Sequence, residues 1–359
     1  MELALYDPDS GYYEREQTTV GRGGDFYTGV SVGPLFGQLL ASKFVEWAGA
    51  ETELDLVEAG AHRGFLARDI LDWLRRLHPG LYQNVRYSLA EPSPRRRGWQ
   101  AGTLGPLAER VTWVSSVEEF GSRPGAQAVV FCNELLDAFP THRLAWEPRS
   151  RGWSELGVGA AGGRFEWVSL GPFEGAPLPP DGVAEVLPEG YLIEFCPAAA
   201  QWWEAAASAI PRGRLLTLDY GLPGGLRFPP ERLRGTLRAF RGHRSSVELL
   251  ADPGDQDLTA DVDFEALRSV GEAAGLTTEV FEEQGRFLTR VAARIWEGGA
   301  VFDPWGPKQT REFLTLSHPQ HLGARFQALI QRKGLPAHSQ ERRGSNTPPS
   351  RPGAPGSPT

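Results

Sequence analysis

The residues with the clearest potential for chemistry lie in the heptapeptide EAGAHRG, residues 58–64. The apolar run LDLVEAG over 54–60 has the length and composition of a buried strand, and a helical pattern follows over 65–77. Gly60 and Gly64 let the backbone turn sharply and approach a ligand closely. The N-terminus of the following helix favours an anionic group. This turn therefore predicts a site for a nucleotide-type cofactor, formed by Glu58, Gly60 and Gly64.

The spacing of the turn separates two cofactor classes. E-x-G-x-x-x-G departs from the dinucleotide fingerprint G-x-G-x-x-G and is closer to the E/D-x-G-x-G-x-G turn by which methyltransferases hold S-adenosylmethionine (SAM). A second strand over 85–91 ends at Glu91, where an acid can accept hydrogen bonds from both ribose hydroxyls. The alternative role of Glu91 is to cap the next helix. For the protein as a whole, a nicotinamide-dependent oxidoreductase is another interpretation. It is disfavoured because the turn lacks the second and third glycines of the dinucleotide fingerprint.

Polar side chains also follow the apolar strand predicted over 128–134. The segment NELLDAFP places Asn133, Glu134 and Asp137 at the sheet edge where doubly wound folds bind ligands. An ordinary turn needs one capping residue at most, so three polar groups indicate a site. A purely structural cap remains the alternative.

The elements that position these residues alternate along the chain. Strands over 54–60, 85–91, 110–116 and 128–134 are separated by helical patterns. This order predicts an α/β fold with a doubly wound, mainly parallel sheet. After Pro140 the runs become short, Trp-rich and interrupted by glycine, which is typical of an antiparallel meander.

The same patterns divide the chain into segments. We expect an N-terminal lid or helical segment over 1–53, a core over 54–140 and 185–300, and the meander over 141–184. Residues 222–260 are rich in Gly, Pro and Arg and predict a helical or loop insertion near the site. A C-terminal helical segment follows over 301–335. Residues 336–359 contain no aromatic or large aliphatic side chain, which predicts a disordered tail.

Composition excludes several classes of protein. The 37 basic and 45 acidic residues give a net charge of -8, so nucleic acid is not an expected partner. No run approaches the roughly 20 apolar residues that span a bilayer, so no membrane insertion is expected. The start of the chain lacks a signal-peptide pattern, which predicts a cytoplasmic protein. Two cysteines without C-x-x-C spacing, and no histidine pair at ligand spacing, predict no metal site.

Nine sequence blocks together resemble a known family. They are LYDPDSGYY, GRGGDFYTGVSVGPLFGQLLA, VEAGAHRGFLARDIL, EPSPRRRGWQ, NELLDAFP, DYG, GTLRAFRGH, PGDQDLTADVDF and EQGRFL. They occur in the order seen in the MidA family of SAM-dependent methyltransferases, and the resemblance covers about residues 3–297. It implies a Rossmann-like methyltransferase core with SAM as cofactor. The acceptor that it implies is an arginine side chain of a protein, with a respiratory-complex subunit as one candidate.

The resemblance also implies roles for single residues. It places the block GGDFYTG beside the SAM pocket as a lid, which adds Gly24, Asp25, Phe26 and Thr28 to the cofactor-binding residues; Asn133 is assigned there too. A helix cap by Asp25 or Thr28 is the alternative.

Three further residues are assigned to catalysis. In an arginine methyltransferase, Glu134 and Asp137 would make bidentate contacts to the guanidinium group. His243 would accept the released proton, although a lone loop histidine is often only solvated.

One departure from the family keeps a second function open. The family's turn reads like E-L-G-P-G-R-G, whereas this chain has Ala59, Ala61 and His62. His62 and the Trp-rich meander favour, as the alternative, a SAM-binding accessory protein that acts through a partner without turnover.

Overall fold

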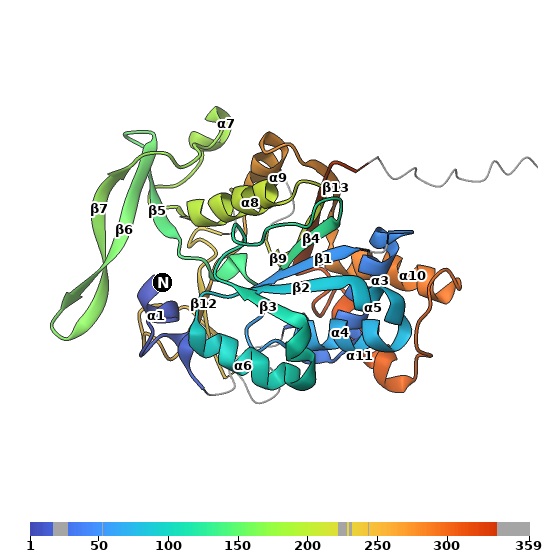
Figure 1. Ribbon diagram of the computed structural model, residues 1–359. Coiled ribbons are helices and arrows are strands. Elements are labelled where there is room, and N and C mark those ends of the chain that lie inside the picture. Colours follow the sequence, from blue (N-terminus) through green and yellow to red (C-terminus); the bar gives the residue numbers. More distant parts are fainter. Residues whose placement is uncertain (17–27, 52, 222–227, 230–231, 243, 336–359) are drawn as a thin grey trace, which may run out of the picture.

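A seven-stranded sheet forms the centre of the molecule (Figure 1). The computed structural model describes residues 1–16, 28–51, 53–221, 228–229, 232–242 and 244–335. The strand order is β13-β14-β9-β4-β1-β2-β3. The strands are β1 (Leu54–Ala59), β2 (Val85–Ala90), β3 (Val111–Val114), β4 (Gln127–Asn133), β9 (Gly213–Tyr220), β13 (Thr277–Glu283) and β14 (Phe326–Lys333). Strands β9, β4, β1, β2 and β3 pair in parallel, whereas β14 is antiparallel to both neighbours.

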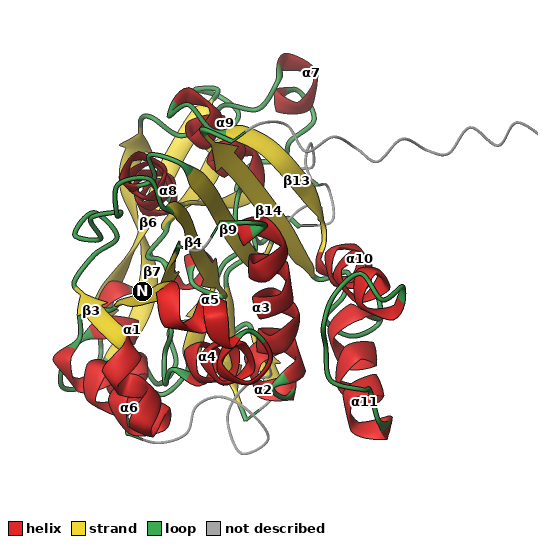
Figure 2. Ribbon diagram, turned by 45° about the vertical axis from the view of Figure 1, so that its right-hand side comes forward, coloured by secondary structure: helices red, strands yellow, loops and turns green. Residues whose placement is uncertain are grey.

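Helices cover both faces of this sheet (Figure 2). One face packs against α3 (Leu35–Ala48), α4 (Phe65–Leu77), α10 (Gln284–Trp296) and α11 (Pro307–Ser317). The other face packs against α8 (Pro197–Ala209) and α9 (Phe264–Ala273). Successive side chains of a strand point to opposite faces, so Leu56 joins the first cluster and Val57 the second. The doubly wound α/β fold is confirmed, including the parallel pairing of β1 with β2.

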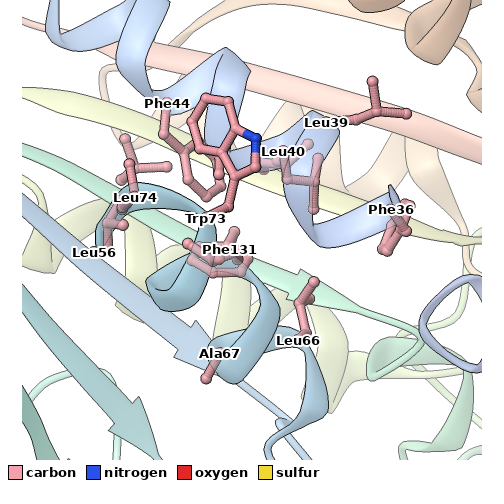
Figure 3. Close-up of a cluster of buried hydrophobic side chains, with 14 of the residues drawn as sticks. Phe36, Leu39, Leu40, Phe44, Leu56, Leu66, Ala67, Trp73, Leu74 and Phe131 are labelled. Carbon is pink, nitrogen blue, oxygen red and sulfur yellow. The ribbon is translucent and has the colours of Figure 1, made fainter. Parts of the chain in front are cut away.

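The larger core cluster fixes the helix that follows the glycine turn. Figure 3 shows side chains of α3, α4, β1 and β4 packed together. The rings of Phe44 and Phe131 lie 5.0 Å apart between centroids, and Trp73 of α4 is fully buried. Because α4 is held onto the sheet along its length, its N-terminus has a defined position at the carboxyl end of β1.

A separate antiparallel sheet follows residue 140. Its order is β7-β6-β5-β8, formed by β5 (His142–Glu147), β6 (Gly152–Ala161), β7 (Arg164–Phe173) and β8 (Leu192–Phe195). The β6–β7 hairpin projects from the body of the molecule in Figure 1. The predicted meander is therefore present, and β8 extends it.

Two segments differ from their predicted structure. Residues 222–260, expected to be a loop or helical insertion, contain the small antiparallel sheet β11-β10-β12, formed by β10 (Arg238–Arg241), β11 (Arg244–Ser246) and β12 (Asp257–Thr259). Strands of three or four residues are too short to show a period in the sequence. Residues 301–335, expected to be helical, contain α11 and then strand β14. Buried glutamines at Gln327 and Gln331 interrupt the apolar pattern of that strand.

Short helices connect these elements. They are α1 (Glu2–Tyr6), η1 (Tyr12–Glu14), α2 (Gly29–Val32), α5 (Pro79–Asn84), α6 (Pro94–Leu104), η2 (Gly105–Arg110), η3 (Leu136–Ala138) and α7 (Asp181–Ala184). Within the segment expected as a lid, α3 belongs to the core. The division of the chain at residues 53, 140, 184 and 300 stays a prediction, and the predicted tail lies outside the described residues. In the described part of the chain, no helix has the length and hydropathy needed to cross a bilayer.

Candidate cofactor and acceptor site

A cavity of about 1600 Å³ opens at the carboxyl ends of β1, β2 and β4. Strand order reverses between β1 and β4, which is where open α/β sheets bind ligands. The volume exceeds that of ordinary small-molecule sites, so it can hold a nucleoside cofactor and a second group beside it. The cavity brings together most of the described residues predicted for the site, namely Thr28, Glu58, Gly60, Glu91, Asn133, Glu134 and Asp137.

The glycine turn after β1 forms one wall of the cavity. Gly60 has φ +72°, and a Cβ added there would lie 2.8 Å from Leu135 Cδ1, so only glycine fits without displacing that side chain. Gly64 has φ +81° and caps α4, but it lies outside the cavity lining. Burial raises the pKa of Glu58 to about 7, and the Tyr87 hydroxyl donates a hydrogen bond of 2.5 Å to it.

His62 occupies this turn in the left-handed region at φ +46°. Its carbonyl accepts a hydrogen bond from Gln100 Nε2 at 3.1 Å. Its ring meets the ring of Tyr13 edge-on, with centroids 6.2 Å apart. Burial lowers the pKa of His62 to about 4, so the imidazole is neutral at pH 7.

The acid after β2 is held by its neighbours. Glu91 Oε1 accepts hydrogen bonds from Ser93 N and Arg96 Nε, both at 2.9 Å, and Oε2 accepts one from Gln100 Nε2 at 3.1 Å. Glu91 is buried yet lines the cavity. A fixed carboxylate at the end of β2 has the position and chemistry to accept hydrogen bonds from ribose hydroxyls.

The turn after β4 carries the acidic part of the cavity. Glu134 has φ +51°, an uncommon conformation for a residue other than glycine. Its Oε1 accepts hydrogen bonds from Gly29 N and Asn133 Nδ2, both at 3.0 Å. Burial, with smaller contributions from Asp219 and Asp257, raises the pKa of Glu134 to about 8.

Asp137 has a different environment from Glu134. It is 4% exposed and lines the cavity, and no described residue donates a hydrogen bond to its side chain. Burial and the carboxylates of Asp219, Glu134 and Asp257 raise its pKa well above the ordinary value. Among the described residues, Asp137 is thus a buried carboxyl group that has cavity space beside it and no hydrogen-bond donor.

Asp219 at the end of β9 stabilises the turn after β4. Its carboxylate accepts hydrogen bonds from Leu136 N at 2.9 Å, Leu135 N at 3.2 Å and Tyr220 N at 2.8 Å. Burial raises its pKa to about 7. These donors come from the backbone, so Asp219 holds the shape of the turn.

Other predicted residues have simpler positions. Thr28 caps α2, because its hydroxyl oxygen accepts from Ser31 N at 3.0 Å while Ser31 Oγ accepts from Thr28 N at 2.9 Å. The remaining predicted residues lie outside the described part of the chain; they are Gly24, Asp25, Phe26 and His243.

Sequence reasoning missed two parts of the cavity. Ser115, Ser116 and Val117 follow β3 and line it beside Glu91, although the strand itself was predicted. Tyr13 and Asp257, from two other segments, also line it. The available signal for the first group was its place at the carboxyl end of a strand predicted over 110–116, whereas β3 ends at Val114.

The cavity fits a SAM-type cofactor. Three groups of the site follow three adjacent strands of one sheet. They are the turn after β1, in which position 60 requires glycine, the fixed acid at the end of β2 and the loop after β3. Residues 36–282 match the family model of S-adenosyl-L-methionine-dependent methyltransferases. The chain belongs to this family. The family predicted from the nine sequence blocks is thereby confirmed, with SAM as its cofactor.

Individual relatives of this SAM-dependent methyltransferase span nearly the whole chain. Protein arginine methyltransferase NDUFAF7 of Mus musculus is 31% identical, with 98% of this chain and 84% of the relative covered. The homologue of Drosophila melanogaster is 30% identical, with coverages of 94% and 82%. A crystal structure of a methyltransferase-type protein from Burkholderia thailandensis, bound to S-adenosyl-homocysteine (SAH), matches with a TM-score of 0.78 at 29% identity. That match covers 93% of this chain and 87% of the other.

These comparisons correct one prediction. The relatives from mouse, fruit fly and rat are named as mitochondrial proteins. The prediction of a cytoplasmic location is therefore wrong. The start of the sequence carried no pattern that separated the two locations.

Proposed function

We propose that this methyltransferase transfers the methyl group of SAM to an arginine side chain of a protein. The observation that carries the proposal is the pair of carboxyl groups on the turn after β4, those of half-buried Glu134 and buried Asp137. They line the same cavity as the glycine turn. The names of the relatives, protein arginine methyltransferases, support the same acceptor.

Carboxylates suit this acceptor for geometric reasons. A guanidinium group is planar, stays charged and presents five N–H donors that match carboxylate oxygens in pairs. Asp137, which receives no hydrogen bond from the described residues, would gain donors from the acceptor. Binding at Glu134 and Asp137 would hold one nitrogen toward the cofactor, and such positioning supplies much of the rate of a group transfer.

The reaction needs an acceptor for one proton. Bound SAM supplies an electrophilic methyl group; a guanidinium nitrogen forms a bond to that carbon as the bond from carbon to sulfur breaks, leaving SAH. The nitrogen then loses one proton. With a pKa of about 8, Glu134 is mainly protonated at pH 7 in the free protein. A bound guanidinium group would favour its ionised form, and that carboxylate could then accept the proton. Glu91, Gly60 and Asn133 would bind the cofactor in this proposal, and Glu58 and Gly64 would support the turn.

The wider partner is part of the same proposal. The relatives' names refer to protein arginine methylation, so we propose a protein substrate. A respiratory-complex subunit is the candidate that the family resemblance implies. His62 and the Trp-rich meander were the reasons to consider an accessory role without turnover, and that role is an outcome of the test below.

The test compares methylarginine sites by mass spectrometry. A deletion strain is complemented with the wild type, with Glu134→Gln or with Glu118→Gln, which makes the same chemical change at an exposed position away from the cavity lining. We expect an arginine site that loses methylation in the deletion strain. Wild type and Glu118→Gln should restore it, and Glu134→Gln should not.

A binding measurement accompanies this comparison. Calorimetry should show that Glu134→Gln still binds SAH, which separates a lost acceptor contact from a lost cofactor site. If no arginine site depends on the protein, or if Glu134→Gln restores methylation fully, the proposal is refuted. SAH binding without any dependent methylation would indicate the accessory role.

A further inference from the structure

Two segments far apart in the sequence form the wall of the cavity that adjoins the turn after β4. Leu5 and Tyr12 of the N-terminal segment pack against Ala239 and Leu258 of the small sheet β11-β10-β12. Figure 1 shows α1 beside β12. The backbone of this wall meets the acidic turn directly, because Ala260 N donates to Asp137 O at 2.8 Å.

Asp257 is the acidic residue of this wall. It begins β12, is 1% exposed and lines the cavity. The Tyr13 hydroxyl donates a hydrogen bond of 2.7 Å to its Oδ1. The charge of Asp257 contributes to the raised pKa of both Glu134 and Asp137, which places the three carboxyl groups within electrostatic reach of one another.

The charges around these groups do not balance within the described part of the chain. Arg238 is the cation that lowers the pKa of Asp137, and it is itself ion-paired with Asp261. Asp137 is buried, and none of the described residues donates a hydrogen bond to its side chain. Several carboxyl groups around one cavity therefore favour a ligand that brings both positive charge and N–H donors.

We infer that Asp257 is a third acceptor-binding carboxylate, which contacts the guanidinium group from the wall beside Glu134 and Asp137, and that Tyr13 positions it. The inference rests on the proposed function and names a residue that decides its acceptor specificity. Carboxylates on two adjoining walls can pair with different N–H groups of a planar guanidinium group, which has five donors, whereas an ammonium group has only three donors around one nitrogen.

Aromatic rings beside Asp257 add to this selectivity. Tyr6 and Tyr13 stack with centroids 5.6 Å apart, and both line the cavity. Tyr6 is fixed by its hydroxyl, which donates to Ala138 O at 2.9 Å. Flat aromatic faces attract a planar guanidinium group and pack against the methylene groups that carry it.

Tyr13 also connects the acceptor wall to the cofactor turn. Its hydroxyl contacts Asp257 while its ring meets the ring of His62. Tyr13→Phe would keep the ring and its contact with His62 but remove the hydrogen bond to Asp257. A purely structural role of Tyr13 would change stability, whereas a positioning role changes acceptor binding at constant cofactor affinity.

The experiment measures binding to the SAH-loaded full chain. The probes are N-acetyl-arginine amide and N-acetyl-lysine amide. Calorimetry measures the binding affinity of each probe, and SAH affinity is measured separately. Asp257→Asn should weaken binding of the arginine probe about 10- to 150-fold, the loss expected for a hydrogen bond to a charged group. Tyr13→Phe should weaken it about 2- to 10-fold. Both variants should bind SAH within about twofold of the wild type.

Asp255→Asn is the matched control. Asp255 lies two residues away, forms an ion pair with Arg15 that is partly exposed, and does not line the cavity. It should leave binding of both probes unchanged. Asp257→Glu keeps the charge and should recover part of the affinity for the arginine probe.

The outcomes separate this inference from the proposed function. If the wild type does not prefer the arginine probe to the lysine probe, the proposed function fails, and the inference with it. If the wild type prefers arginine but Asp257→Asn and Tyr13→Phe retain full affinity, only the inference is overturned. Equal losses in Asp255→Asn and Asp257→Asn would also overturn it.

Discussion

Gly60→Ala tests the cofactor turn at the atom where the structure leaves least room. An added Cβ would lie 2.8 Å from Leu135 Cδ1 and 3.1 Å from Leu135 Cβ. Leu135 connects the acidic residue Glu134 to the turn that Asp219 holds. The substitution is therefore expected to displace both the turn after β1 and the turn after β4.

Two effects of this substitution have different consequences. The left-handed φ of +72° strains any residue other than glycine by about 1–2 kcal/mol. Because this strain is present with and without the cofactor, it lowers the free energy of unfolding and leaves affinity unchanged. Displacement of the turn instead removes a close backbone contact. Loss of one hydrogen bond to a charged ligand group should weaken SAH binding about 10- to 100-fold, or about 1.4–2.8 kcal/mol.

Calorimetric titration with SAH and urea unfolding measure the two effects separately. Gly105→Ala is the control, because Gly105 has φ +54° and open space where its Cβ would be. Gly105→Ala should lose stability and keep its SAH affinity, whereas Gly60→Ala should lose both. Unchanged SAH affinity in a folded Gly60→Ala protein would refute the assignment of this turn to the cofactor.

Three further predictions concern the same cavity. Glu91→Gln should weaken SAH binding about 10- to 150-fold in a calorimetric titration, because a charged acceptor of ribose hydroxyls is lost; unchanged affinity would place the ribose elsewhere. His62→Gly should raise the free energy of unfolding by about 1 kcal/mol, by relieving the strain at φ +46°, and should keep SAH affinity within a few fold; a large loss of affinity would show that the imidazole binds the cofactor. The raised pKa of Glu134, about 8, means that the folded state binds more protons than the unfolded state between about pH 4.5 and 8, so this group stabilises the protein at low pH and its contribution falls as the pH rises. In urea unfolding between pH 5 and 8, Glu134→Gln should reduce that fall by up to about 1.4 kcal/mol per pH unit, and an identical pH profile would contradict the assigned protonation.

The parallel half of the sheet could be predicted because its residues carry strong local patterns. Strands β1, β2, β4 and β9 are buried on both faces and read as apolar runs. Strand β14 could not be predicted in this way. Gln331 is fully buried there, accepts a hydrogen bond from Trp203 Nε1 at 2.8 Å and donates one to Arg268 O at 2.9 Å. Only tertiary partners make a glutamine acceptable at that position.

The residues of the candidate site were also only partly predictable from the sequence. Four site residues could be found because they lie at or just after the carboxyl ends of predicted strands, and parallel strands end at one edge of the sheet; they are Glu91, Asn133, Glu134 and Asp137. Asp257 lies on a strand of three residues. Its approach to Glu134 depends on how a distant segment folds back, and no spacing in the sequence encodes that contact.

The position of β14 has a consequence for the synthesis of the protein. Phe326–Lys333 lies between β9 and β13, so the last strand of the described residues to leave the ribosome completes the interior of the sheet. Until then β9 presents an unpaired edge next to Leu216 and Leu218, both of which are fully buried in the finished fold. Newly made chains must therefore remain incomplete through most of translation and depend on protection from aggregation. A stop codon at residue 325 should abolish the native sheet, although it removes none of the cofactor-binding residues proposed above.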